Sequence, residues 1–157
     1  MVKSDLAWFL EIRNFVRSNL HDSRSFTFDE VVLWFDSLSN LEYFVIEICG
    51  DGNRVTEIGY IRYRNLNALG VSEIGMDLHP NFQGQSLAYK AYVAFAIMQI
   101  ETSDIRLWIL RVKSSNNRAL KLYSRLGFDL AGKYKIDSDT DDLLMFATVL
   151  RIAQLPA

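Results

Sequence analysis

The sequence has 157 residues, a length that suits one domain built on a single hydrophobic core. Half of the residues are hydrophobic and 23% are charged, proportions that exclude a disordered chain. The formal net charge of −2 excludes a strong positive field, so nucleic acid is not an expected partner. This net charge does not exclude a local basic patch that binds a phosphorylated ligand.

The composition also bears on compartment, membrane and metal. No apolar run approaches the ~18 residues that span a bilayer, and the charged segment that begins at Met1 lacks the features of a signal peptide. The single cysteine, Cys49, cannot form an internal disulfide, and its place in the apolar run 43–49 predicts a buried strand residue. Two histidines and one cysteine do not suggest a metal site. We therefore expect a soluble cytoplasmic protein with no metal and no membrane partner.

Two amphipathic helices are predicted in the N-terminal part. Apolar residues recur at helical spacing over 5–20, and Arg13 and Arg17 fall on the same side as this apolar stripe. A plain core-facing stripe does not predict arginines there. A capping-box pattern at 27–30 opens a second helix, which is expected to end near 39–40.

Three strands are predicted next, as a β-meander. The apolar run 41–48 and the segment 55–64 are joined by a strong hairpin turn at 50–53. The segment 71–78 is expected to be the third strand.

Helices and strands alternate in the rest of the chain. A helix with a wide apolar face follows Gln83, a strand buried on both faces is expected at 105–112, and a helix at 115–126. A final antiparallel pair is expected at 128–136 and 143–150. This order predicts an α+β fold, with a mixed central β-sheet flanked by about four helices and a right-handed crossover in its middle.

The segment between the third strand and the next helix suits phosphate binding. The first backbone amides of a helix are unpaired and lie at the positive end of its dipole, so they can cradle a pyrophosphate if no large side chain intervenes. Gly84, Ser86 and Ala88 are small enough for such an approach. The same pattern also fits a plain connection, and it is neither a Walker loop nor a dinucleotide fingerprint.

A second motif runs Asn-Asn-Arg-Ala-Leu-Lys-Leu-Tyr-Ser-Arg-Leu-Gly-Phe from position 116. With both motifs present, the sequence resembles the GNAT acetyltransferase superfamily. In that family the acetyl-CoA loop runs Gln/Arg-x-x-Gly-x-Gly/Ala, and a later helix carries Asn-x-x-Ala-x-x-Leu-Tyr before a basic residue and Gly-Phe. Gln83 and Ala88 match the ends of the loop motif, whereas Ser86 stands where glycine is usual. The helix motif is matched at Asn116, Ala119, Leu122, Tyr123, Arg125, Gly127 and Phe128.

The resemblance implies an acetyl-CoA-dependent N-acyltransferase that occupies residues 1–157 as a single GNAT domain. Acetyl-CoA is the implied co-substrate, bound in a V between two splayed parallel strands that end near Leu78 and Val112. The cofactor-binding residues that the resemblance implies are Met76, Asp77, Leu78, Gln83, Gly84, Gln85, Ser86, Leu87, Ala88, Asn116, Arg118 and Tyr123.

The resemblance also implies direct attack of the amine on the thioester, so the amine must lose a proton and the leaving thiolate must gain one. Tyr123 is the implied acid and Glu73 the implied base, with Asp77 as a rival base on the same face of its strand. Alternatively, Tyr123 packs against the sheet and Glu73 forms an edge salt bridge. Asn116 either binds the pantetheine arm or caps its helix. His79 is expected to be a turn residue.

Arg111 bears on the nature of the acceptor. In the related group that acetylates the N-terminus of a ribosomal protein, the matching position holds a catalytic glutamate, and an arginine cannot be that base. It can instead pair with a phosphate or carboxylate of the substrate, or face solvent.

The N-terminal part weakly resembles enzymes that acetylate nucleotide-linked amino sugars, and also the ribosomal-protein group. The acceptor-side residues expected on these grounds are Arg13, Asn14, Trp34, Tyr60, Arg62 and Arg111. We therefore expect acetyl transfer to a primary amine, on a nucleotide-linked amino sugar or another small molecule. A polyamine, an amino acid, an aminoglycoside and a protein amine stay open as acceptors.

A non-catalytic acetyl-CoA sensor or interaction module is the competing hypothesis from another class. Retention of Tyr123 argues against it, because a mere binder has no thiolate to protonate. A homodimer is a further expectation taken from the family.

Overall fold

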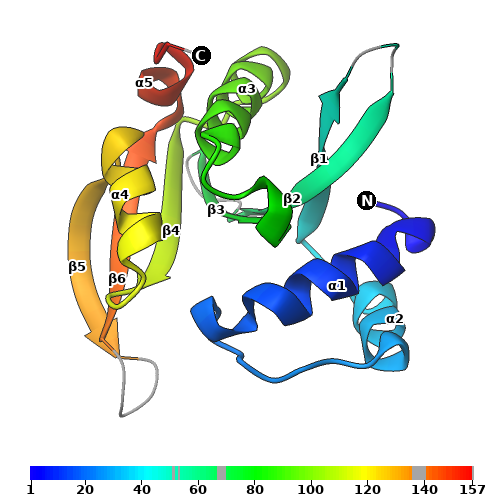
Figure 1. Ribbon diagram of the computed structural model, residues 1–157. Coiled ribbons are helices and arrows are strands. Elements are labelled where there is room, and N and C mark those ends of the chain that lie inside the picture. Colours follow the sequence, from blue (N-terminus) through cyan, green and yellow to red (C-terminus); the bar gives the residue numbers. More distant parts are fainter. Residues whose placement is uncertain (51, 53, 67–69, 136–140, 157) are drawn as a thin grey trace. The chain divides into compact units, whose positions relative to one another are not determined.

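A computed structural model describes residues 1–50, 52, 54–66, 70–135 and 141–156. This part of the chain divides into two compact units, which we call the first unit (Met1–Arg64 and Gly75–Gln85) and the second unit (Asn65–Ile74 and Ser86–Ala157). The described strands form a mixed sheet in the order β1-β2-β3-β4-β6-β5 (Figure 1). The prediction of an α+β fold with a mixed central sheet is confirmed. The prediction of one domain over 1–157 stays a prediction.

The elements in chain order are the 3₁₀ turn η1 (Lys3–Asp5), α1 (Leu6–Val16), the 3₁₀ turn η2 (Arg17–Asn19), α2 (Phe28–Asp36), β1 (Glu42–Cys49), β2 (Val55–Asn65), β3 (Val71–Leu78), the 3₁₀ turn η4 (Pro80–Phe82), α3 (Leu87–Thr102), β4 (Leu107–Lys113), α4 (Asn117–Arg125), β5 (Asp129–Lys135), β6 (Asp141–Thr148) and α5 (Val149–Ala153). The strand β3 begins in the second unit and ends in the first.

Helices α1 and α2 of the first unit lie side by side (Figure 1). The helix predicted over 5–20 is α-helical to Val16 and continues as the 3₁₀ turn η2. The capping box that opens α2 is confirmed, because the Thr27 amide donates to the Glu30 carboxylate at 2.7 Å and the Glu30 amide donates to the Thr27 hydroxyl at 3.3 Å. The apolar face of α1 is buried against α2 and β2, in a core made of Leu6, Phe9, Ile12, Val16, Val31 and Tyr60.

The predicted hairpin is present as the antiparallel pair β1 and β2, with a bulge between Ile46 and Glu47. Two residues of its turn, at 51 and 53, lie outside the described residues. The prediction for Cys49 is wrong in part, since this residue ends β1 as expected but is exposed. It is the last residue of the terminal strand in the sheet order, where neighbouring strands and helices cover little of the chain.

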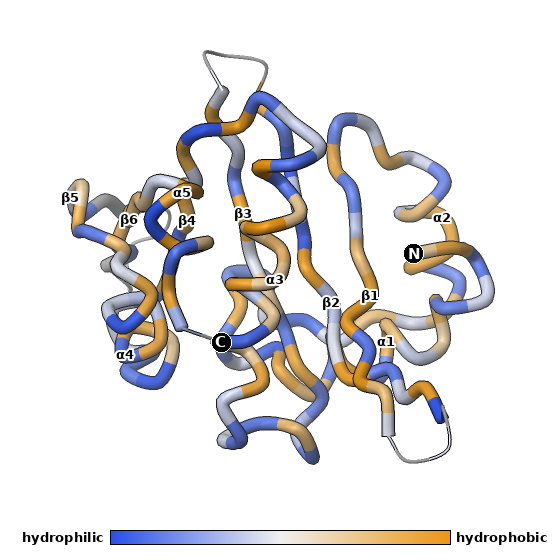
Figure 2. Tube along the Cα trace, turned by 90° about the horizontal axis from the view of Figure 1, so that it is seen from above, coloured by the Kyte–Doolittle hydropathy of each residue, from blue (hydrophilic) through white to orange (hydrophobic). Residues whose placement is uncertain are grey.

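In the second unit β3 pairs in parallel with β4, and β4 and β5 each pair antiparallel with β6. Helix α3 lies beside α5 (Figure 1), and hydrophobic residues recur along α3 (Figure 2). The largest fully buried side chains of this unit are those of Ile74, Tyr92, Val93, Trp108, Leu110, Leu126, Asp142, Val149 and Ile152.

The C-terminal end differs from the sequence prediction. The strand expected over 143–150 ends at Thr148, whose hydroxyl accepts a hydrogen bond from the Arg151 amide at 3.4 Å and so caps the short helix α5. The fifth helix was not predicted because the apolar run that spans this junction fits a strand as well as a helix. The acidic turn at 137–142 lies largely outside the described residues.

Candidate active site

An aromatic cluster lies in the first unit on the face of β1 and β2 that α1 and α2 cover. The ring of Phe9 stacks on Trp34, with centroids 5.2 Å apart and planes 6° apart, and contacts Tyr60 at 4.7 Å. Tyr43 meets Trp34 edge-on at 5.2 Å. The acceptor-side candidates Trp34 and Tyr60 are therefore brought together by Phe9 and Tyr43.

Charged groups adjoin this cluster. Tyr60 and Arg62 are alternate residues of β2, so they share one face of the strand. The Tyr60 hydroxyl donates a hydrogen bond to the Asp77 carboxylate. The Arg62 guanidinium lies across Gly75, where an added Cβ would approach its Nη2 to 2.7 Å. Asp77 and Gly75 of β3 are thus the positions that meet the side chains of Tyr60 and Arg62.

The acid–base properties of these groups follow from burial. Burial raises the pKa of Asp77 above its ordinary value, against the opposing effects of the Arg62 charge, the Tyr60 hydrogen bond and the Arg13 charge. Burial raises the pKa of Tyr43 to about 12 and that of Tyr60 well above its ordinary value. Both phenols are therefore neutral at physiological pH, while Asp77 is a carboxyl group held closer to neutrality than an exposed one.

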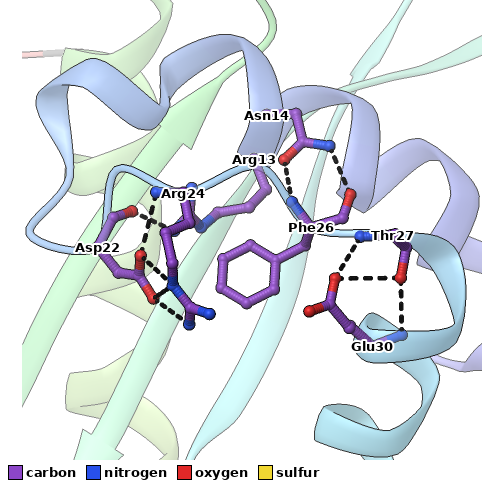
Figure 3. A network of polar contacts seen from close by, with 7 residues as sticks. All are labelled: Arg13, Asn14, Asp22, Arg24, Phe26, Thr27 and Glu30. Carbon is purple, nitrogen blue, oxygen red and sulfur yellow. Dashed lines mark hydrogen bonds and ion pairs between the residues drawn. The ribbon is translucent and has the colours of Figure 1, made fainter.

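Arg13 and Asn14, from α1, organise the segment between α1 and α2 (Figure 3). The Asn14 side chain donates to the Phe26 carbonyl at 2.9 Å and accepts from the Phe26 amide at 3.0 Å. Arg13 Nη2 donates to the Asp22 carbonyl, and the Arg13 guanidinium lies over the Phe26 ring, 4.9 Å from its centroid. Arg24 lies over the same ring at 5.0 Å and is paired with Asp22 at 2.8 Å. Asn14 thus holds a loop, and its acceptor contact stays a prediction.

The predicted base Glu73 and the predicted substrate residue Arg111 contact each other in the second unit. Glu73 Oε1 lies 2.7 Å from Arg111 Nη2 and accepts from Arg111 Nε at 2.8 Å. The side chain of Glu73 is 13% exposed and that of Arg111 40% exposed. The alternative that the sequence left open for Glu73 was a salt bridge at a sheet edge; a salt bridge is present, but it joins the two middle strands, β3 and β4.

The loop after β3 is held by its glutamines. Gln83 Nε2 donates to the Leu78 carbonyl at 2.8 Å, and Gln85 Nε2 donates to the Asn81 carbonyl at 2.9 Å. His79 is a turn residue as predicted, since its Nδ1 accepts from the Asn81 amide at 3.3 Å. The backbones of Met76 and Leu78 end the strand before this loop.

The helix expected from Gln83 begins at Leu87. Gly84 and Ser86 both adopt left-handed conformations, with φ of 81° and 60°. Glycine is suited to such positions, which is a physical reason for the family's usual glycine where this chain has Ser86. The Ser86 side chain makes no capping hydrogen bond, so the first amides of α3, at Leu87 and Ala88, receive no partner from it.

Helix α4 carries the remaining candidates. The Asn116 side chain accepts from the Ala119 amide at 3.1 Å and so caps the helix, which was the alternative role for this residue. Arg118 is exposed in the first turn. The buried ring of Tyr123 packs edge-on against Tyr92, with centroids 6.0 Å apart, and at a tilt against Phe128, with centroids 5.5 Å apart. The packing role of Tyr123 is thus present, and its role as an acid stays a prediction.

Phe9 and Tyr43 are the members of the aromatic cluster that the predicted acceptor-side residues did not include. Tyr43 lies opposite Arg62 in the register of the hairpin. A hairpin centred on the predicted turn at 50–53 would instead pair position 43 with position 60. The observed register differs, in part because of the bulge between Ile46 and Glu47, so the predicted turn did not indicate this pairing.

The described residues contain no cluster of three or more His, Cys, Asp or Glu side chains arranged to hold a metal ion. Among them, no helix combines the length and the apolar character that a membrane crossing requires.

Comparisons with known proteins agree with the fold. The family model described as an acetyltransferase (GNAT) domain matches residues 4–129. No curated protein is significantly similar to the sequence. Among solved structures, a spermidine N-acetyltransferase from Vibrio cholerae in complex with CoA and spermine is similar, with a TM-score of 0.80 and 18% identity over 97% of this chain and 94% of that one.

Two further structures are similar. A domain from Methanocaldococcus jannaschii has a TM-score of 0.80 at 17% identity, covering 94% of each chain. A protein from Salmonella typhimurium, solved with its cofactor acetyl-CoA, has a TM-score of 0.72 at 19% identity, covering 95% of this chain and 91% of that one.

Proposed function

Because the chain belongs to the GNAT acetyltransferase family, whose members are acetyl-CoA-dependent N-acyltransferases, we propose that it acetylates the primary amine of a small molecule by direct attack. The observation that carries this proposal is the family match over 4–129, which spans both the loop motif and the motif of α4. Nucleotide-linked amino sugars and other small amines are the proposed acceptors. We also propose that the protein is a cytoplasmic homodimer and that each chain is a single domain.

The loop before α3 fits a pyrophosphate. The first amides of α3 lack a side-chain cap from Ser86, and a Cβ added at Gly84 would meet no atom within 4 Å, so the backbone is open to close approach. By the resemblance, we assign the phosphates to residues 83–88 and Arg118, and the pantetheine arm to the backbone of 76–78 and to Asn116. The bound co-substrate supplies the thioester that the amine attacks.

The proton from the amine needs a base. Glu73 is committed to two contacts with Arg111, whereas Asp77 accepts from Tyr60 and has a raised pKa. A base works best when its pKa lies near the operating pH. We therefore propose Asp77 as the group that accepts this proton, with Glu73 as the alternative.

The leaving thiolate needs a proton. Tyr123 is the proposed donor, as the family motif implies. Packing against Tyr92 and Phe128 fixes the ring, and a fixed ring points its hydroxyl in one direction. The acceptor is proposed to lie against Arg13, Asn14, Trp34, Tyr60 and Arg62, with Arg111 paired to Glu73.

Calorimetric titration of acetyl-CoA into the wild type and the Ser86→Trp variant tests the cofactor site. We expect micromolar binding that Ser86→Trp abolishes, because the indole would fill the space over the first amides of α3. Ser39→Trp, at another exposed serine, is the matched control and should bind as the wild type does.

Release of CoA in the presence of an amine panel then tests the reaction. Turnover with at least one amine supports the proposal. Binding of acetyl-CoA without CoA release from any amine would instead favour the sensor hypothesis, and no binding at all would refute the proposal.

A further inference from the structure

One nitrogen of the Arg13 side chain, in the first unit, has no hydrogen-bond partner among the described residues. The guanidinium is held by the Asp22 carbonyl at Nη2 and by the Phe26 ring below its plane. Nη1 is buried and meets no hydrogen-bond acceptor within the part of the chain that the structure describes. A buried guanidinium N–H without an acceptor is costly, so this atom is suited to a ligand that supplies one.

The charge of the guanidinium itself favours an anionic ligand. The charges of Arg62, Arg13, Arg64 and Asp77 act on Tyr43, and the charge of Arg13 also acts on the exposed carboxylate of Asp22. Both Arg62 and Arg13 also act on Asp77. The planar guanidinium of Arg13 matches the oxygens of a carboxylate or phosphate, so an oxyanion is the ligand that best satisfies its unpaired N–H.

We propose that Arg13 Nη1 binds a carboxylate or phosphate of the acceptor, so that the acceptor is an amine which also carries an oxyanion. This rests on the proposed function and narrows it. The ammonium group of such an acceptor would be complementary to Asp77 and its oxyanion to Arg13, so both charges would be matched. A polyamine would bring only further positive charge to this arginine-rich site. The site thus differs in charge from one suited to spermine, the ligand named in the Vibrio cholerae structure.

Two pairs of amines that differ by one oxyanion test the proposal. Glucosamine and glucosamine-6-phosphate differ by a phosphate, and putrescine and ornithine differ by a carboxylate. Calorimetry in the presence of CoA would measure the dissociation constant of each amine. We expect the wild type to bind the anionic member at least tenfold more tightly in one pair, and the pair that shows the preference identifies the oxyanion.

Variants assign the preference to Arg13. Arg13→Gln should reduce it about 30-fold or abolish it, which corresponds to the ~2 kcal/mol lower bound for losing one partner of a buried hydrogen-bonded charge pair. Arg13→Lys keeps the charge and should retain part of the preference, so it also covers a failure of Arg13→Gln to fold. Arg24→Gln is the matched control, because Arg24 lies over the same Phe26 ring but is exposed and should leave the preference unchanged.

The outcomes separate this proposal from the proposed function. A wild type that binds both members of each pair equally, prefers the amine without the oxyanion, or binds none of them overturns the assignment. If acetyl-CoA still binds and CoA is still released with another amine, the acetyltransferase function stands. A weaker affinity for acetyl-CoA in Arg13→Gln, with the amine preference intact, would assign the oxyanion to CoA and also overturn the proposal.

Discussion

The left-handed conformation of Ser86 leads to a prediction about stability. A left-handed conformation costs an L-residue other than glycine roughly 1–2 kcal/mol, and Ser86 adopts φ of 60° and ψ of 7°. Its side chain makes no capping hydrogen bond that a substitution would lose. Glycine would remove that cost from the folded state, but it would also stabilise the unfolded chain by roughly 0.4–1 kcal/mol through greater conformational freedom. Ser86→Gly should therefore raise the free energy of unfolding by about 0.5–1 kcal/mol.

Urea denaturation at equilibrium measures this change. The midpoint should rise while the slope stays constant, since the same surface is exposed on unfolding. Asn40→Gly is a second test of the same kind, because Asn40 also has a positive φ, of 57°. Ser103→Gly is the opposite control. Its φ is −147° and its hydroxyl donates to the Gln99 carbonyl at 2.8 Å, so this variant should be less stable.

The reasoning would be refuted if Ser86→Gly lost about 1 kcal/mol, the usual penalty of glycine within a helix. That result would mean that Ser86 caps α3 or has an ordinary conformation in solution. The same variant also informs on the cofactor. An unchanged affinity for acetyl-CoA is expected if backbone amides bind the phosphates, whereas a tenfold loss would show that the hydroxyl is a phosphate donor.

Three other predictions concern packing, proton transfer and pH. Gly59→Ala should destabilise the protein by about 1–3 kcal/mol in urea denaturation, because the added Cβ would lie 2.5 Å from the Asp77 carbonyl oxygen. Gly132→Ala is the control, because a Cβ added there would meet no atom within 4 Å. Equal losses of stability in the two variants would contradict the packing argument. Tyr123→Phe should lower kcat by about 10²–10⁴ and leave the affinity for acetyl-CoA unchanged, whereas an unchanged kcat would exclude Tyr123 as the acid. Asp77 has a folded-state pKa above its unfolded value, so its contribution to stability is present below the unfolded pKa and is lost as pH rises through the folded pKa. Asp77→Asn should therefore gain stability relative to the wild type as pH rises across that window, and it should lose acetyltransferase activity. A difference in stability that does not change with pH would contradict the pKa shift.

Much of the fold follows from local pattern. The strand Val71–Leu78 has the bounds predicted, and the hairpin and the capping box at Thr27 are where turn and cap chemistry place them. The terminal helix α5 was missed because burial of its apolar residues, such as Ile152, depends on packing that the sequence does not reveal. The exposure of Cys49 likewise depends on its place at the end of a terminal strand.

The site was predictable where a residue's type determines its role, and less so where partners determine it. The motif residues of the loop and of α4 could be named from the resemblance alone, and their roles in binding and catalysis stay predictions. The contact between Glu73 and Arg111 joins positions 38 apart in sequence, and no local pattern indicates that each is the other's partner. Tyr43 was missed for a related reason, since its relation to Arg62 comes from hairpin register and not from its own surroundings in the sequence.

The two hydrogen bonds of Asn14 have a consequence for genetics. A single side-chain amide satisfies both the donor and the acceptor of the Phe26 backbone, so neither aspartate nor leucine can replace both functions. A mutational screen for activity would therefore score position 14 as intolerant of substitution even if the amine substrate does not contact Asn14. Loss of activity at position 14 indicates a role in substrate binding only if the amount of folded protein is measured as well and is unchanged. The same holds for any other position of this loop at which substitutions abolish activity.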